Sequence, residues 1–396
     1  KSFLTVPLCN HADEIIGVLQ LVNAKDPATG ETISFSKALE PIVIALASSA
    51  AIALDNQILL QDHKDLLDAF IKVIAQAIDA KSQHTSAHCQ RVPVLTELIA
   101  QAACETEDGP LSTFDLDEGE WYELRVASWM HDCGKLATPD SVLDKATKLH
   151  LMQDGIETVK TRFAAAMAQV ELQFLRQTQA QPAQLNALQD VLAAELAALK
   201  DDCLFIEKAN VGGEFMKPED QAHVRRIAGR KWVDHLGMER PMLSEEEVKF
   251  LCIERGTLSF DERQKINDHM KVTVQMLESL PFPKNLKRVP EYAGGHHEKM
   301  DGTGFPRGLK REEMSWPARM MAIADVFEAL TASDRPYKQP MKISQALGIL
   351  QNMKRQNHID PDLFDLFVMS RVWEKYARIY LRPEQLDITD AATYLQ

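Results

Sequence analysis

Two adjacent histidines precede a turn rich in glycine in this sequence. The stretch GGHHEKMDGTGFPRGL, residues 294–309, places His296 beside His297 and follows them with acidic residues, glycines and a proline. Two neighbouring imidazoles at one turn indicate that both are needed at the same place. Neutral imidazoles and carboxylates are what divalent transition metals bind when no thiolate is offered. The pair therefore predicts a metal site that other histidines would complete.

Other histidines occur in helical segments with acidic residues nearby. WMHDCGKL contains the adjacent pair His131 and Asp132, and KINDHMKVTVQML places His269 on an amphipathic segment. HTSAHCQRV contains His84 and His88, which would share one face if this segment is helical. A lone His–Asp pair is usually a surface or capping pair, and a lone helix histidine is usually structural. The combination is a much stronger indication of metal binding than any member.

Asp325 lies in the middle of MAIADVFEAL, an otherwise apolar helical segment. A buried carboxylate is costly unless it is paired or coordinated, and a metal would account for it. In an adjacent His–Asp pair, the histidine can bind one metal while the carboxylate bridges two. Two metals roughly 3.5–4 Å apart generate hydroxide between them and clamp a phosphoryl group. This set of residues therefore suits two-metal hydrolysis.

The composition limits the partners and the compartment. The chain has 396 residues and a net charge of −14, which argues against broad binding of nucleic-acid polymers. A small anionic ligand could still bind, because metal ions reverse the charge of a pocket locally. The six cysteines include no CxxC pair, which suits a reducing cytoplasm.

No segment of the sequence predicts a signal peptide or a membrane span. The longest apolar run, residues 42–54, includes Ser48 and Ser49 and is short for a bilayer-spanning helix. We therefore expect a cytoplasmic location and no membrane contact within this chain. Because the first residue is lysine, we also expect the sequence to be a fragment of a longer chain.

The elements that must position these residues are mostly helical. Apolar runs and turns in residues 1–35 predict strands, and a long helix is predicted from about residue 41. A heptad column along it predicts either a parallel helix pair or an amphipathic helix packed on its own domain. The column consists of Ala45, Ile52, Leu59, Leu66 and Val73.

The remainder of the chain divides into helical regions and one distinct segment. Residues 65–149 and 260–396 are predicted to be helical. Residues 156–203, rich in Ala, Leu, Gln and Glu, predict two long helices joined at Pro182. Residues 205–255 have no clear period.

HDCGK, HHEKMDGTGFPRGL, ADVFEALTASDRPYK and DPDLFDLF, in this order, resemble the HD-GYP family. These proteins are metal-dependent phosphodiesterases that hydrolyse cyclic di-GMP, within the HD phosphohydrolase superfamily. The resemblance covers about residues 65–149 and 256–370. It implies a mainly α fold, an HD-type helical bundle over residues 61–396. An insertion at about 150–255 interrupts the bundle, and we expect a protruding helical hairpin there rather than a lid over the site.

The resemblance implies a role for each residue that matches the family's motifs. The implied metal ligands are His88, His131, Asp132, His269, His296, His297 and Asp325. Lys135 would lie beside the phosphate, and Arg335 and Lys338 would hold the phosphates as charged donors. Asp301 and Gly302 would shape the turn around the base. Phe305, where the family has tyrosine, could stack on a guanine without the phenol hydroxyl.

The resemblance implies two divalent ions and leaves a third open. Some family members bind a third metal through a glutamate four residues before the first conserved histidine, and His84 occupies that position here. We expect His84 to be a ligand; the alternative is a histidine that only hydrogen-bonds beside the cluster. Histidine and carboxylate ligands favour iron or manganese, and nickel or zinc fits the same set.

The implied reaction is attack of a metal-bridging hydroxide on phosphorus of cyclic di-GMP. The product would be linear pGpG, with a further cut to GMP as an option. The same chemistry on 3′3′-cyclic GMP-AMP or another nucleotide is one alternative. A receptor that binds a cyclic dinucleotide without hydrolysing it is another, and the complete ligand set argues against it.

Residues 1–60 resemble the C-terminal half of a GAF domain, an α/β module that binds small ligands or dimerises. The resemblance rests on VPLCN, EIIGVLQLVNA and FSKALEPIVIALASSAAIALDNQILL. It implies a homodimer formed through this region and the connecting helix. For a bacterial second-messenger enzyme, a diguanylate cyclase is a further expected partner.

Overall fold

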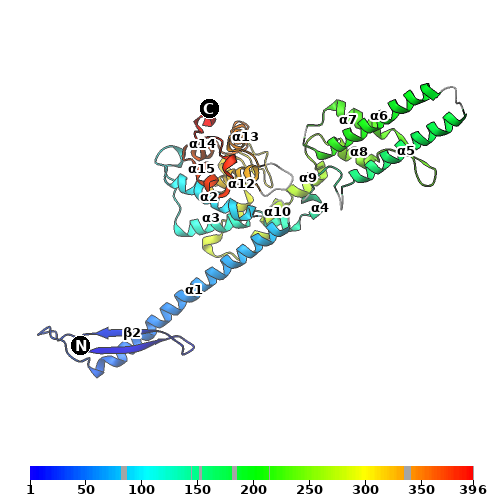
Figure 1. Cartoon of the computed structure of the whole chain (residues 1–396). Helices are drawn as coiled ribbons and strands as arrows, with labels where there is room; N and C mark the ends of the chain where they lie inside the picture. The colour runs from blue at the N-terminus through cyan, green and yellow to red at the C-terminus, as the bar shows by residue number, and fades with distance from the viewer. Residues whose placement is uncertain are drawn as a thin grey trace. The chain divides into compact units, whose positions relative to one another are not determined.

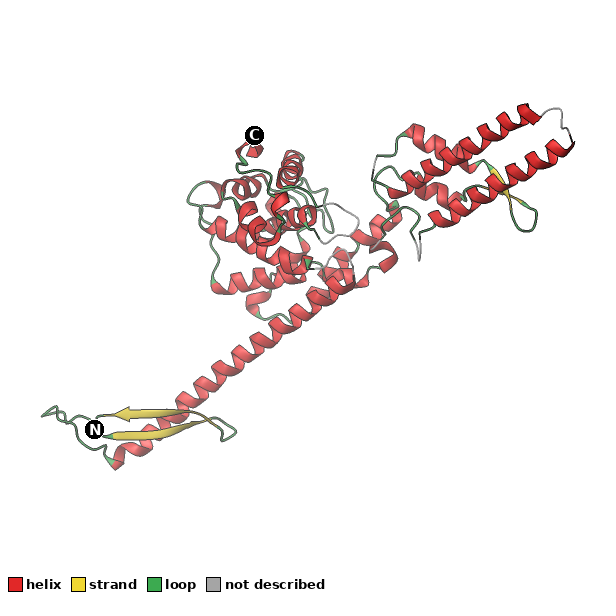
Figure 2. Cartoon of the chain, viewed as in Figure 1, coloured by secondary structure: helices red, strands yellow, loops and turns green. Residues whose placement is uncertain are grey.

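The computed structural model describes residues 1–81, 87–143, 145–150, 154–180, 185–213, 215–333 and 340–395. The chain forms two compact units, Lys1–Val73 and Ile74–Gln396. Figure 1 shows the elements in chain order, and Figure 2 shows that helices dominate. The expectation of a mainly α fold is therefore confirmed.

The first unit is a β-hairpin followed by a long helix. Strands β1 (Phe3–Cys9) and β2 (Ile15–Val22) pair in antiparallel register, with Phe3 opposite Val22. A short 3₁₀ turn η1 (Lys37–Leu39) precedes α1 (Glu40–Lys81). Val6 of β1 and Val43 and Ala47 of α1 form a small buried core. The strands and the long helix expected from the sequence are thus confirmed.

The heptad column of α1 lies on an exposed face. Ile52, Leu59, Leu66 and Val73 are each 43% exposed or more. The prediction that this column packs on its own domain is therefore wrong for the described chain, because the hairpin contacts a different face through Val43 and Ala47.

Residues 37–81 also have the length and composition of a membrane span. An 18-residue window there has a mean hydropathy of 1.7, and 17% of that window is buried. The uninterrupted apolar run is shorter than a span, as the sequence indicated, but the helix around it is long enough. Length and composition alone do not distinguish a span from a helix that pairs with another helix.

The second unit is a helical bundle built around α2 and α12, which pack against each other. Its core contains Leu95 and Ile99 of α2, Phe327 of α12, and Phe367 and Trp373 of the last helices, all fully buried or nearly so. The bundle helices are α2 (His88–Cys104), α3 (Glu118–Met130), α4 (Asp140–Leu143), α9 (Phe260–Asn267), α10 (His269–Glu278), α11 (Val289–Gly294), α12 (Trp316–Thr331), α13 (Ile343–Arg355), α14 (Pro361–Met369) and α15 (Val372–Tyr380).

Short 3₁₀ helices connect the bundle helices. They are η2 (Gly109–Leu111), η3 (Cys133–Ala137), η5 (Lys284–Leu286), η6 (Arg311–Glu313), η7 (Pro383–Gln385) and η8 (Ala392–Leu395). The second of these, η3, begins just after His131 and Asp132, which follow the end of α3.

The insertion is a helical hairpin with its own hydrophobic core. Helices α5 (Ile156–Ala180) and α6 (Leu185–Val211) lie side by side, which confirms the predicted hairpin (Figure 1). The segment without a clear period forms shorter elements: α7 (Pro218–Ala228), β3 (Lys231–Val233), β4 (Glu239–Pro241) and α8 (Glu245–Leu251). Phe163, Ile206 and Val224 are buried in this separate core.

The end of α1 belongs to the second unit and is fastened to the start of α2. Ala87 has a left-handed backbone and supplies no side-chain cap to α2. The Asp79 carboxylate, in the last turn of α1, instead accepts a hydrogen bond from the Cys89 amide at 3.2 Å. Lys81 donates to the Leu136 carbonyl of η3 at 2.5 Å. Asp79 thus caps a helix whose first residue is His88.

We predict that Asp79→Ala destabilises the second unit by about 0.5–2 kcal/mol, the range for losing a helix N-cap. Asp79→Asn keeps an oxygen acceptor and should stay close to wild type, because burial already raises the pKa of the Asp79 carboxyl. Urea unfolding followed by circular dichroism measures the difference. Equal stability of the two variants would mean that Asp79 does not cap α2.

Candidate metal centre

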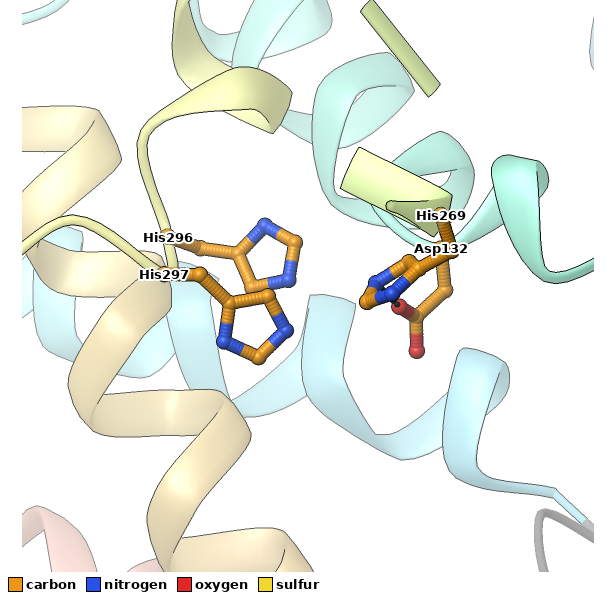
Figure 3. A group of neighbouring side chains, drawn as sticks. All are labelled: Asp132, His269, His296 and His297. Atoms are coloured by element: carbon orange, nitrogen blue, oxygen red, sulfur yellow. Dashed lines mark ion pairs between the residues drawn. The ribbon is translucent and has the colours of Figure 1, made fainter. Parts of the chain in front are cut away.

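The histidines and aspartates singled out in the sequence converge on one place in the bundle. His131 ends α3, Asp132 follows it, and His269 begins α10. His296 and His297 come directly after α11 (Figure 3). His88 begins α2, and Asp325 lies in the middle of α12. Almost every one of these side chains therefore sits at or just beyond a helix end.

Three of the imidazoles share one hydrogen-bonding arrangement. In His131, His269 and His296, the Nδ1 atom pairs with a backbone carbonyl three residues earlier. Helix ends leave such carbonyls without intrahelical partners, so the imidazoles satisfy them. The acceptors are the carbonyl oxygens of Ser128, Ile266 and Ala293.

The opposite ring nitrogens of these three histidines are buried and face the cluster. Within the described residues, Nε2 of His131, His269 and His296 has no hydrogen-bond partner, and neither has Oδ1 of Asp132. A buried polar atom without a partner costs roughly 1–3 kcal/mol. Metal ions bound among these atoms would satisfy them. The donor set is therefore one that fits a divalent metal.

Asp132 belongs to two groups of potential ligands. One group is Asp132 with His269, His296 and His297, and the other is Asp132 with His88 and His131. Within each group, the potential donor atoms lie within 4.8 Å of one another. Asp132 is 1% exposed, and its two oxygens lie 3.2 Å from His269 Nε2 and 3.3 Å from His131 Nε2. A carboxylate shared in this way can bridge two ions.

Asp325 completes the side of the cluster that contains His88. Its Oδ1 lies 3.2 Å from Nε2 of His88 and 3.9 Å from Nε2 of His131. Its side chain is 15% exposed, more than any other carboxylate of the cluster. The apolar helix α12 therefore places the Asp325 carboxylate in the cluster. The sequence had indicated that this carboxylate needs a partner, because it lies in an otherwise apolar helical segment.

The electrostatics keep Asp132, His296 and His297 in the forms that can bind a metal. Burial would raise the pKa of Asp132, but Lys135 and His131 hold that pKa well below its usual value. Burial lowers the pKa of His296, and it lowers the pKa of His297 to about 4. At neutral pH the carboxylate is charged and these imidazoles are neutral, which is what metal binding requires.

Lys135 lies at the edge of the cluster. Its ammonium donates to Asp132 Oδ2 at 2.5 Å, and its side chain is 18% exposed. Asp132 and Asp325 raise the pKa of Lys135 above its ordinary value, although burial opposes them. A positive charge is thus held next to the proposed bridging carboxylate.

The glycine turn packs directly behind His297. The buried Glu298 carboxylate accepts backbone hydrogen bonds from Arg307, Gly308 and Leu309, which close the loop. A Cβ on Gly304 would come within 2.4 Å of the Lys299 nitrogen, so the loop requires glycine there.

Three residues of this turn, Asp301, Gly302 and Phe305, were predicted to lie around the substrate. Phe305 stacks on the His297 ring, with centroids 4.9 Å apart. Asp301 accepts from the Thr303 amide in an exposed turn and lies outside both metal-binding groups. Gly302 has a φ of +79°, a conformation that favours glycine. Gly302 therefore has a backbone suited to a tight turn, and Phe305 contacts a predicted ligand.

Three predicted residues, His84, Arg335 and Lys338, lie outside the described residues. The expectation that His84 and His88 share one helix face therefore stays a prediction. The sequence analysis also missed two residues, Glu328, which pairs with His88, and Arg91, which pairs with Glu328. The available signal was a second acid, Glu328, one turn after Asp325 in the same apolar segment.

Comparisons with known proteins match this arrangement. A family model described as an HD domain matches residues 246–363, which include four of the clustered side chains. A 3′3′-cGAMP-specific phosphodiesterase (number 3) of Vibrio cholerae is 36% identical over 308 residues, covering 77% of this chain and 40% of the relative. The chain belongs to the HD-GYP family. Four side chains of the cluster thus come from the part of this HD-GYP chain that matches the HD domain.

Two cyclic di-GMP phosphodiesterases are also similar to this HD-GYP chain. The Pseudomonas aeruginosa protein is 47% identical over 74 residues, 18% of this chain and 17% of the relative. The Thermotoga maritima protein is 24% identical over 212 residues, 49% of this chain and 56% of the relative. The chain therefore spans about half or less of the length of these relatives.

We predict that Asp132→Ala lowers the content of both metal ions, because Asp132 belongs to both ligand groups. His131→Ala should also lower metal content, and both variants should lose turnover. Metal content is measured by mass spectrometry after dialysis, with Asp201→Ala as a control for an exposed aspartate on α6. An Asp132→Ala protein with a full metal load and the wild-type rate would refute the assignment of this pair.

Proposed function

We propose that this chain is a metal-dependent phosphodiesterase that hydrolyses a cyclic dinucleotide. The observation that carries the proposal is the sharing of Asp132 between two groups of histidines, all but His297 of them buried. Two divalent ions held there would supply Lewis acidity and a deprotonated water at neutral pH. The names of the similar proteins support a cyclic dinucleotide as the substrate class.

The chain's own residues would bind and orient the phosphodiester. We propose His88, His131, Asp132, His269, His296, His297 and Asp325 as metal ligands. Lys135 would counter the negative charge that develops on the phosphoryl oxygens, since its ammonium already lies beside Asp132. We propose Arg335 and Lys338 as further phosphate donors.

The turn after His297 would receive a base of the substrate. Asp301 and Gly302 shape its tip, and Phe305 forms its apolar wall against His297. Because Phe305 already has one face on His297, stacking on a guanine would use the other face. A phenylalanine offers no hydroxyl donor, so base recognition there would rest on stacking.

Cyclic di-GMP is the substrate that we propose first, with cleavage to pGpG and then to GMP. The second candidate is 3′3′-cyclic GMP-AMP, which the Vibrio cholerae relative matching 77% of this chain favours. Anaerobic assays with each dinucleotide, with products separated by chromatography, test both. Turnover of either one supports the phosphodiesterase, whereas tight binding without any linear product would favour a receptor.

We propose iron or manganese as the bound metals, with nickel or zinc as alternatives. Imidazole and carboxylate donors suit all four ions, and the described cluster contains no thiolate. We propose two ions, with a third if His84 is a ligand.

We also propose a homodimer formed through α1 and the GAF-like region. The support is the exposed apolar column of α1, which would be covered by a parallel copy of the same helix. A diguanylate cyclase partner stays a prediction. A cytoplasmic location is supported by the six cysteines, which form no disulfide.

We predict that Lys135→Ala and Arg335→Ala slow hydrolysis by ~10²–10³-fold, the loss typical of one preorganised donor. Both should retain their metals, because neither side chain is a proposed ligand. Single-turnover rates and metal content are compared with those of Lys265→Ala, an exposed lysine on α9. Metal loss in Lys135→Ala would show that a ligand had been mistaken for a substrate contact.

We predict that His84→Ala lowers the metal stoichiometry by one without emptying the other two sites. If His84 only hydrogen-bonds beside the cluster, the variant should keep the wild-type number of ions and lose affinity by ~10–100-fold. Metal counting at saturating metal separates the two cases. A fully loaded structure with two ions and His84 turned to solvent would refute ligation.

A further inference from the structure

We propose that Glu328 is a positioning residue that fixes the imidazole of His88 for metal binding, with Arg91 holding Glu328 in turn. The inference rests on the proposed metal centre and extends it to residues that do not bind metal. Nδ1 of His88 pairs with Oε2 of Glu328, and the other carboxylate oxygen accepts from Arg91 Nε at 2.6 Å. Glu328 is completely buried.

The hydrogen bond to Glu328 decides which nitrogen of His88 faces the metal site. With the Nδ1 proton donated to Glu328, the Nε2 lone pair is free for a ligand bond. Nε2 lies 3.2 Å from Asp325 and 3.5 Å from Asp132, within the cluster. Glu328 thus sets both the tautomer and the ring orientation of His88.

The acceptor of His88 differs from those of the other buried histidines. The other three use carbonyls at the ends of the preceding helices. His88 is the first residue of α2, and its Nδ1 pairs with a side chain of another element, Glu328 of α12.

Arg91 makes the buried carboxylate tolerable. An unpaired buried carboxylate would be very costly, and a well-formed ion pair offsets that cost. Arg91 lies one turn after His88 on α2, and Glu328 lies one turn after Asp325 on α12. The two helices are therefore aligned so that Asp325 faces Nε2 of His88. One turn further along α12, Glu328 faces Nδ1 of His88 and the guanidinium of Arg91.

The arrangement has a chemical consequence for this histidine. A charged acceptor raises the basicity of the metal-bound imidazole more than a neutral carbonyl does. Of the four buried histidines, His88 pairs with a carboxylate, whereas His131, His269 and His296 pair with carbonyls. The ion held by His88, His131 and Asp132 should therefore depend on Glu328 more than the other ion does.

The test is metal affinity in the absence of substrate. The affinity of metal-free protein for Mn²⁺ is measured by competition with a chromophoric chelator, for wild type, Glu328→Gln and Glu123→Gln. Glu123 is a matched control, because it is a buried glutamate like Glu328. Its carboxylate accepts a hydrogen bond from the Arg288 backbone amide rather than from a histidine of the cluster. We expect Glu328→Gln to weaken one of the two ions by ~10–100-fold and Glu123→Gln to weaken neither.

Wild-type affinity for both ions in Glu328→Gln would overturn the inference and leave Glu328 as a structural partner of Arg91. If that variant does not fold, Arg91→Gln/Glu328→Gln removes both buried charges and is measured in its place, with the same two outcomes. Failure of the proposed function is separable, because the wild type would then bind no metal or would bind it without hydrolysing a cyclic dinucleotide.

Discussion

The Asp132 carboxylate is buried among imidazoles, and the rest of the site depends on keeping it charged there. Water cannot solvate it at 1% exposure, so its charge has to be balanced by the groups around it. Lys135 and the surrounding histidines hold its pKa well below the usual range. The same oxygens lie close to the ring nitrogens of both ligand groups. A divalent cation on each side would balance this charge far better than a single lysine.

Helix ends bring the proposed ligands to this carboxylate. His131, His269 and His296 each use Nδ1 to satisfy a carbonyl that a helix end leaves open, so the opposite nitrogen points into the cluster. His88 begins α2, and its Nδ1 pairs instead with Glu328, which likewise points the opposite nitrogen into the cluster. Asp79 at the end of α1 then fixes the first turn of α2. The ligand geometry is therefore determined by helix termini and by the packing of α2 on α12.

Much of this could be predicted from the sequence, because the chemistry is carried by residues in short motifs. The His–Asp pair, the double histidine and the acid in an apolar helix were all found, and the structure brings them together. Glu328 and Arg91 were missed because their role depends on which two helices pack together, and no single segment contains that information. The helical hairpin at 156–203 could be predicted because the segment is long and rich in helix-forming residues, whereas the short elements between 212 and 255 are too brief to produce a clear period.

The central claim is that Asp132 lies between two metal ions. The most direct measurement is anomalous X-ray diffraction from crystals of the manganese-loaded protein, collected on both sides of the manganese absorption edge. The account predicts two anomalous peaks ~3.5–4 Å apart. One would lie against His88 and His131, the other against His269, His296 and His297, with Asp132 between them. A single peak, or peaks that do not contact Asp132, would contradict the account.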